Sequence, residues 1–262
     1  MQDLTISLVQ IDQVWEDKKA NFSLYEEMLA RIEKPDLILL PEMFQTGFTM
    51  NTELAEPFAT SESIIWLKEK AREKQAAIYT SLMIIENGET TNRGVFVSPT
   101  GELDFYDKRK TFTLAGEHEK ITTGKSQKII DYLGWKIQLQ ICYDLRFPEI
   151  HRNLWNASNG SAAYDILLFV ANWPAKRGEH WRTLLKARAI ENQCFVAAVN
   201  RVGQDMKELD YIGDSTVFNA LGNQLNDFSN GQGVVSTVLE FQDLQKIRAD
   251  LPFLQDQDAT NC

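Results

Sequence analysis

Residues 138–149, with the sequence QLQICYDLRFPE, contain the clearest junction between a strand and a turn in this chain. An apolar run ends there in a single cysteine, Cys142, and a charged and aromatic segment follows at once. A cysteine in this position is either a small apolar residue that completes a strand or a nucleophile that the strand holds in place. The residues that end the other strands are needed to choose between the two.

Strand-like and helix-like patterns alternate on both sides of this junction. Amphipathic helices are expected at residues 18–32 and 61–74, near 147–156 with Pro148 at the start, and at 180–193. Apolar or alternating runs typical of strands fill most of the intervals between them. These runs lie at residues 4–10, 36–42, 76–85, 93–108, 135–142, 165–174, 194–200, 214–225 and 233–240.

Several expected strands are joined by tight turns, such as NGE at residues 87–89, so antiparallel pairs must accompany parallel ones. We therefore predict an α/β fold in which helices cover two mixed sheets, a four-layer α-β-β-α sandwich. An ordinary doubly wound sheet is the alternative. No linker-like or repeated segment interrupts the sequence, so residues 1–262 are predicted to form a single domain with 241–262 as a C-terminal extension.

The composition narrows the classes of function. A net charge of −10 and a pI near 4.9 disfavour nucleic-acid binding, which needs clustered lysine and arginine. No apolar run approaches the roughly 20 residues of a membrane span, and the N-terminus lacks the basic region of a secretory signal, so no membrane association is expected. Cys142, Cys194 and Cys262 show no paired spacing, which indicates a reducing compartment and predicts a cytoplasmic protein.

Two other strands also end in a reactive side chain, Glu42 after LILLP and Lys108 after LDFYD. Each has an ordinary explanation by itself, because a charged residue after a strand is usually solvated. Sites in α/β folds gather beyond the carboxyl ends of strands, so these residues and Cys142 can meet there. Together they match a thiol hydrolase, in which Glu42 takes the thiol proton while Lys108 and the backbone N–H of Tyr143 stabilise a tetrahedral oxyanion.

Three segments, LLPEMF, FYDKRKTF and QICYDLRFPE, resemble in this order the signature segments of the nitrilase superfamily, the carbon–nitrogen hydrolases. The resemblance implies that Glu42 is the general base, Lys108 the catalytic lysine and Cys142 the nucleophile. A second family glutamate falls on Glu117 in AGEHEKITTG, with Glu119 close enough to be the alternative. The resemblance implies that no metal and no cofactor is required.

The segments PEMFQTGFTM and ANWPAKRGEHW resemble the omega-amidase branch, and the likeness to the superfamily runs from the first strand to about Val238. It implies a small amide substrate, such as alpha-ketoglutaramate or alpha-ketosuccinamate, cleaved through a thioester on Cys142 to the dicarboxylate and ammonia. It also implies a homodimer, for which helix 180–192 offers a face unless its apolar residues cover their own sheet. These residues are Trp181, Leu184, Leu185 and Ile190.

An alpha-carboxylate on such a substrate needs a local positive charge. Arg177 is the first candidate because its guanidinium matches the two carboxylate oxygens; a solvated loop arginine is the alternative. Trp173 and Phe48 are predicted to wall the pocket, with ordinary core packing as the alternative. Asp144 and Arg146, beside the nucleophile, are expected to form an ion pair that holds the turn; contact with the substrate is the alternative.

Other interpretations stay open at this point. The same residues would serve a related amidase, such as one for deaminated glutathione or a carbamoyl amide. A Cys–His hydrolase would pair Cys142 with His180, although a packing role at a helix start is expected for this histidine. A metal enzyme is disfavoured because His118, His151 and His180 show no i, i+4 spacing. A non-catalytic scaffold is disfavoured because all three reactive residues are present.

Overall fold

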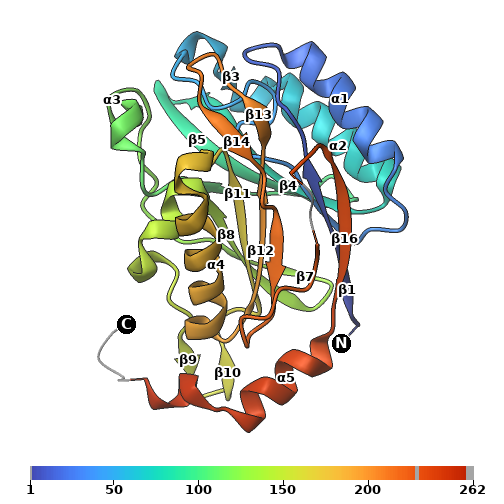
Figure 1. Ribbon diagram of the computed structural model, residues 1–262, viewed down its shortest axis with the longest axis vertical. Helices are drawn as coiled ribbons and strands as arrows, with labels where there is room; N and C mark the ends of the chain where they lie inside the picture. The colour runs from blue at the N-terminus through green and yellow to red at the C-terminus, as the bar shows by residue number, and fades with distance from the viewer. Residues whose placement is uncertain (1, 228–229, 258–262) are drawn as a thin grey trace.

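Two mixed β-sheets lie face to face in the computed structural model, which describes residues 2–227 and 230–257 (Figure 1). The first sheet has seven strands, in the order β16-β1-β2-β4-β5-β6 with β3 beside β4. The pairs among β1 to β4 are parallel, whereas β16, β5 and β6 pair antiparallel with their neighbours. The bounds are β1 (Leu4–Gln10), β2 (Leu37–Leu39), β3 (Glu56–Pro57), β4 (Ala77–Glu86), β5 (Glu89–Val97), β6 (Leu103–Asp107) and β16 (Gly233–Leu239).

The second sheet has five strands in the order β15-β12-β11-β8-β7. Its three central strands are parallel, and β7 and β15 add antiparallel edges. Two short hairpins, β9 with β10 and β13 with β14, stand apart from both sheets. The bounds are β7 (Ile129–Tyr132), β8 (Trp135–Ile141), β9 (Trp155–Asn156), β10 (Ser161–Ala162), β11 (Ile166–Ala171), β12 (Phe195–Asn200), β13 (Val202–Gln204), β14 (Asp210–Ile212) and β15 (Thr216–Phe218).

Helices cover the outer faces of the sheets. In Figure 1, α1 and α2 lie together beside the first sheet, and α4 runs along the second. Side-chain oxygens cap the first two helices, Asp17 accepting from the N–H of Ala20 and Ser61 from that of Ile64. The helix bounds are α1 (Lys18–Ala30), α2 (Glu62–Lys74), α3 (Glu117–Lys120), α4 (Gly178–Asn192) and α5 (Phe241–Asp250).

Apolar side chains from both sheets meet in a shared core. Leu8 and Leu39 of the first sheet and Leu139 and Leu168 of the second are fully buried in one cluster. A second cluster joins the opposite face of the first sheet to α1 and α2. The α-β-β-α sandwich is thus confirmed, and the doubly wound sheet is wrong because the strands divide into two sheets packed on each other.

The helix expected near residues 147–156 is wrong. The chain there makes only a 3₁₀ turn, Pro148–Ile150, before it enters β9. Asn153 explains the difference, because its side chain donates to the carbonyls of Tyr164 and Asn192, both at 2.9 Å, and its N–H donates to the Asn192 side chain. These bonds tie the segment to distant strands and helices in place of its own helical carbonyls.

The apolar face of α4 divides between two environments. Trp181 and Leu185 are fully buried and cover their own sheet, whereas Ile190 is 46% exposed. Cys194, directly before β12, is buried, and Cys262 lies outside the described residues. Within the described ranges, none of the helices combines the length and apolar character needed to cross a membrane.

Candidate active site

Cys142 sits where β8 ends and a 3₁₀ helix, Cys142–Arg146, begins. Its φ of 43° lies in the left-handed region, which residues other than glycine adopt only when the surrounding structure requires it. Asp144 helps to hold this turn, because its carboxylate accepts a hydrogen bond from the N–H of Ile141 at 3.0 Å. The Cys142 thiol faces the carbonyl oxygen of Asn172, at the end of the neighbouring strand β11, at 3.9 Å. The turn therefore sets the thiol at the carboxyl ends of two parallel strands.

Lys108 follows β6 and lies between two buried glutamates. Its Nζ is 2.8 Å from Oε1 of Glu42, which follows β2, and 3.0 Å from both carboxylate oxygens of Glu117, at the start of α3. All three side chains are without solvent exposure. Glu119, the alternative to Glu117, is exposed and points to His118 instead. The structure therefore brings Glu117 to the lysine and leaves Glu119 at the surface.

Two asparagines that sequence reasoning missed complete the surroundings of Glu42. Asn92, in β5, donates from Nδ2 to Oε1 of Glu42 at 2.9 Å and to Oε1 of Glu117 at 3.3 Å. Asn172 donates its backbone N–H to Oε2 of Glu42 at 3.0 Å and its side-chain amide to the Glu42 carbonyl at 2.6 Å. Asn172 ends a strand, the same signal that singled out Glu42, whereas Asn92 lies inside a strand and has no such signal.

The buried charges determine the protonation of the site. Burial would lower the pKa of the Lys108 ammonium, but the charges of Glu117 and Glu42 raise this pKa above its ordinary value. Burial and the negative charge of Glu42 raise the pKa of the Cys142 thiol, against the opposing effect of Lys108. The resting site therefore holds a protonated lysine and a protonated thiol beside a carboxylate, so the thiol needs a base at the moment of attack.

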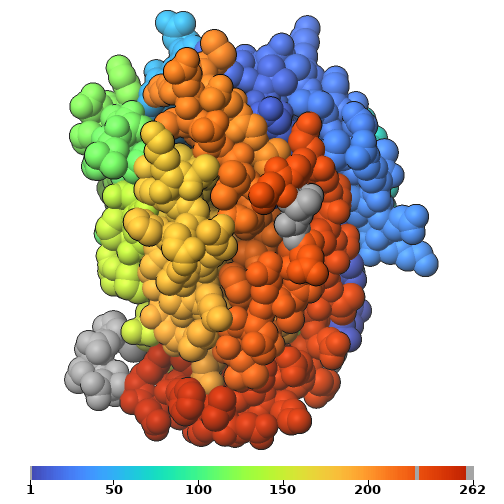
Figure 2. Space-filling view, in the orientation of Figure 1, coloured from blue at the N-terminus to red at the C-terminus, as the bar shows by residue number. Residues whose placement is uncertain are grey.

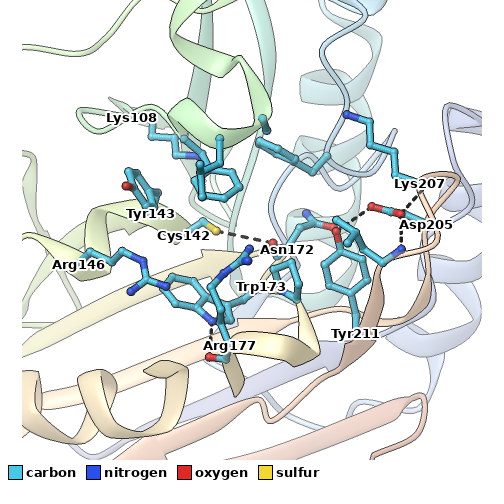
Figure 3. Close-up of a pocket in the computed structure, with 16 residues that line it drawn as sticks. Lys108, Cys142, Tyr143, Arg146, Asn172, Trp173, Arg177, Asp205, Lys207 and Tyr211 are labelled. Atoms are coloured by element: carbon cyan, nitrogen blue, oxygen red, sulfur yellow. Dashed lines mark hydrogen bonds between the residues drawn. The ribbon is translucent and has the colours of Figure 1, made fainter. Parts of the chain in front are cut away.

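A cavity of about 230 Å³ opens onto Cys142 and Lys108. The four residues proposed for substrate contact, Phe48, Tyr143, Trp173 and Arg177, all line it. Figure 3 shows Arg146, Trp173 and Arg177 on one side of the thiol and the side chains of the β13–β14 hairpin beyond Asn172. The remaining lining residues are Phe112, Leu114, Ala115, Pro174, Asp205, Lys207, Leu209 and Tyr211.

The expected ion pair between Asp144 and Arg146 is wrong. Asp144 is fully buried and accepts from the hydroxyl of Tyr106 at 2.9 Å and from a backbone N–H of the Lys108 loop. Arg146 turns the other way and lies over the ring of Trp173, 4.6 Å from its centroid. The two side chains leave the 3₁₀ turn in different directions, and the Arg146 side chain lines the pocket.

Arg146 and Arg177 place two positive charges in the pocket wall. Burial and the charge of Arg177 lower the pKa of Arg146, as expected for two neighbouring guanidinium groups. Within the described part of the chain, neither arginine has a carboxylate partner; Arg177 lies over Phe112, at 5.3 Å, and Arg146 donates to Nδ1 of His180 at 3.4 Å. Unpaired arginines around a cavity are a suitable site for a carboxylate.

The geometry does not support the two alternative sites, a Cys142–His180 pair and a metal site. His180 receives its hydrogen bonds from Arg146, and no bond joins it to Cys142 within the described residues. No group of three or more metal-ligating side chains occurs in residues 2–227 and 230–257. The reactive groups gathered at the pocket are the Cys142 thiol, the Lys108 ammonium and the carboxylates of Glu42 and Glu117.

Comparison with known proteins places this geometry in a family. The chain matches the carbon–nitrogen hydrolase family over residues 5–249. It is 41% identical to omega-amidase YafV of Yersinia enterocolitica and 30% identical to 2-oxoglutaramate amidase of Bacillus subtilis, alignments that cover 98% and 96% of both chains. A crystal structure of XC1258 from Xanthomonas campestris, a CN-hydrolase superfamily protein with an arsenic adduct in its active site, superposes with a TM-score of 0.96 at 39% identity, covering 99% of this chain and 98% of the other. The chain therefore belongs to the carbon–nitrogen hydrolase family.

Proposed function

We propose that the protein is an omega-amidase, which hydrolyses the terminal amide of a small keto-acid amide to a dicarboxylate and ammonia. One observation carries the proposal: the buried Glu42–Lys108–Glu117 cluster behind Cys142 adjoins a small pocket with two arginines that have no carboxylate partner among the described residues. The cluster suits amide hydrolysis, and the arginines suit a substrate with a carboxylate. The names of the Yersinia and Bacillus relatives agree with this substrate class.

In the proposed reaction, Glu42 removes the proton of Cys142 as the sulfur attacks the amide carbon. The ammonium of Lys108 and the N–H of Tyr143 stabilise the oxyanion that develops on the carbonyl oxygen. Glu42 returns the proton to the nitrogen, ammonia leaves, and a thioester remains on Cys142. Water, activated by Glu42, then adds to the thioester, and the carboxylic acid and the free thiol are released. Glu117 holds the Lys108 ammonium in place throughout.

The pocket favours a short substrate that carries one negative charge. Arg146 and Arg177 are proposed to bind the alpha-carboxylate, while Trp173 and Phe48 wall the carbon chain. Asp205, the acidic residue in the wall, accepts from the Tyr211 hydroxyl at 2.9 Å and from two backbone N–H groups. It is therefore already engaged, and an amino acid such as glutamine would bring its ammonium toward two arginines.

The test measures ammonia release from alpha-ketoglutaramate by the purified protein, with glutamine as the control substrate and Cys142→Ala as the control protein. We expect turnover of the keto-acid amide that is lost in Cys142→Ala, and little turnover of glutamine. If the keto-acid amide is not hydrolysed while Cys142 still reacts with iodoacetamide, the thiol hydrolase stands and the substrate is wrong. A protein whose Cys142 resists alkylation would instead support a binding scaffold.

We also propose that the protein is a cytoplasmic homodimer that pairs through the outer face of α4. This face forms part of the surface shown in Figure 2. Ile190 and Leu221 are 46% and 47% exposed there, and a side-chain carbon at Gly222 would meet Ile190 at 2.6 Å, so the turn packs closely on the helix. Light scattering should give twice the mass of the chain, and Ile190→Glu should yield a monomer. A monomeric wild-type protein would contradict the proposal.

A further inference from the structure

Asn92 is a buried amide that bridges both carboxylates of the site. It lies in β5 with no solvent exposure, and its Nδ2 donates to Glu42 and to Glu117. Its backbone carbonyl accepts the N–H of Lys108 at 3.0 Å, which continues the pairing of β5 with β6 to the catalytic lysine. One residue therefore contacts all three members of the cluster.

The chemistry of the position calls for a neutral donor. An amide nitrogen carries two hydrogens, and here each carboxylate can receive one. The Oδ1 atom of Asn92 has no hydrogen-bond partner within the described residues, so donation to the two carboxylates accounts for its side-chain hydrogen bonds. An aspartate of the same shape would offer no donor and would add a third negative charge around the single ammonium of Lys108.

The hydrogen bonds of Glu42 show what this donor achieves. Oε1 receives Lys108 and Asn92, whereas Oε2 receives the backbone N–H of Asn172, whose carbonyl lies 3.9 Å from the Cys142 sulfur. The Cys142 thiol is itself hydrogen-bonded to the Glu42 side chain, and with Oε1 anchored by two donors, Oε2 is the oxygen left to face it. Loss of the Asn92 donor would leave Oε1 held by Lys108 alone, so the carboxylate would be less firmly oriented toward the sulfur.

We propose that Asn92 is a positioning residue, which orients Glu42 for proton transfer with Cys142 and keeps Glu42 and Glu117 at fixed positions around Lys108. Tests of the proposal by turnover rest on the proposed amidase function. Tests by the reactivity of the Cys142 thiol do not, because they need no substrate. It assigns Asn92 an effect on the chemical step and little effect on substrate binding, because Asn92 does not line the cavity.

The experiment compares Asn92→Asp and Asn92→Ala with Thr91→Val. Thr91 is the neighbouring buried residue of the same strand, and its hydroxyl has no partner within the described residues, so Thr91→Val changes the strand without touching the site. For each variant, kcat and KM are measured across pH. The rate of Cys142 alkylation by iodoacetamide is measured across pH in a Cys194→Ala, Cys262→Ala background. Thermal unfolding is followed alongside.

We expect Asn92→Ala to lower kcat by about 10- to 100-fold with KM nearly unchanged. The reason is that the variant loses a hydrogen bond to a charged group. Asn92→Asp should shift the acid limb of the kcat/KM profile and the alkylation midpoint upward by about one pH unit, because the added charge disfavours ionisation of its neighbours. Thr91→Val should match the wild type in both profiles. If Asn92→Asp does not fold, the kcat and KM values of Asn92→Ala against those of Thr91→Val decide the proposal.

Equal pH profiles for Asn92→Asp and wild type, or a loss confined to KM or to thermal stability, would overturn the positioning role. The alkylation profile needs no substrate. A shifted alkylation midpoint in a protein that leaves alpha-ketoglutaramate untouched would therefore support Asn92 and reject the proposed substrate. An unshifted alkylation midpoint in a protein that hydrolyses alpha-ketoglutaramate would reject the role of Asn92 and support the proposed substrate.

Discussion

Oε1 of Glu42 and Nζ of Lys108 lie 2.8 Å apart in the interior, although the residues are 66 positions apart in the chain and neither side chain is exposed. With Glu117 on the other side of the lysine, two carboxylates share one ammonium. Buried ion pairs add little net stability, yet removing one partner leaves charges without compensation. The relationship therefore couples the stability of the protein to its chemistry.

Lys108→Met is expected to lower the free energy of unfolding by roughly 3–5 kcal/mol and to abolish turnover, because it leaves two buried carboxylates face to face. Lys110→Met is the matched control. Lys110 is two positions away, its side chain is 34% exposed, and it pairs with Glu149 at 3.3 Å, so its loss should cost less than about 1 kcal/mol. Urea unfolding measures both. Equal stability of the two variants would show that the Lys108 ammonium does not stabilise the cluster with Glu42 and Glu117.

Glu42→Gln is expected to lower the alkylation midpoint of Cys142 while it abolishes amide hydrolysis. Burial and the charge of Glu42 raise the pKa of this thiol, and Lys108 lowers it, so neutralising the glutamate removes one of the two causes that raise the pKa while the effect of Lys108 remains. Iodoacetamide reactivity across pH measures the effect, again with Cys194 and Cys262 replaced. An alkylation midpoint above that of the wild type would contradict this description of the electrostatics.

Arg177→Met and Arg146→Met should each reduce kcat/KM for a keto-acid amide by about 10- to 100-fold, mostly through KM, because in the proposed binding mode each removes a charge-assisted hydrogen bond to the substrate carboxylate. A short neutral amide should lose little. Lys176→Met, next to Arg177 but exposed and outside the pocket wall, should behave as the wild type toward both substrates. Equal losses for the neutral amide would show that the arginines support the fold of the pocket and not the carboxylate.

His151 should make the protein sensitive to acid. Its ring is buried edge-on against Phe169, and burial, then the charges of Arg188, Arg152 and Arg109, lower its pKa from 6.5 to about 3. Well above pH 6.5 the ring is neutral in both the folded and the unfolded state and contributes no pH dependence. Below that value the unfolded chain gains a proton that the folded protein does not take up, so stability falls as the pH falls.

As the pH falls from 6.5 to about 4.5, His151 should lower the free energy of unfolding by roughly 2–3 kcal/mol. His151→Leu should flatten the dependence of the unfolding temperature on pH over this range. His118→Gln, at an exposed histidine, is the control and should keep the wild-type slope. Identical slopes for His151→Leu and the wild type would assign the acid sensitivity to other groups.

Local patterns predicted the framework of the molecule. Apolar alternation and caps such as Asp17 and Ser61 act within a few residues, so most strands of the two sheets and the helices α1, α2 and α4 could be predicted from sequence. The sequence patterns did not predict the strands β3 and β7 or the helix α5. The helix expected after Pro148 failed because Asn153 bonds to residues 11 and 39 positions away, which no local pattern records. The expected Asp144–Arg146 pair failed for a related reason, since Asp144 bonds to Tyr106, 38 positions earlier.

The sequence by itself determined which residues could carry the chemistry, because Glu42, Lys108 and Cys142 each interrupt an apolar strand at its end. Only the tertiary structure decided how they are held. It selected Glu117 over Glu119, brought Asn92 and Asn172 to Glu42, and turned Arg146 into the pocket. The physical reason is that strand and helix periodicity depend on residues close together in the sequence. A buried carboxylate is instead oriented by hydrogen-bond donors that the packing of the two sheets brings to it, in the case of Asn172 and Glu42 from 130 positions away in the chain.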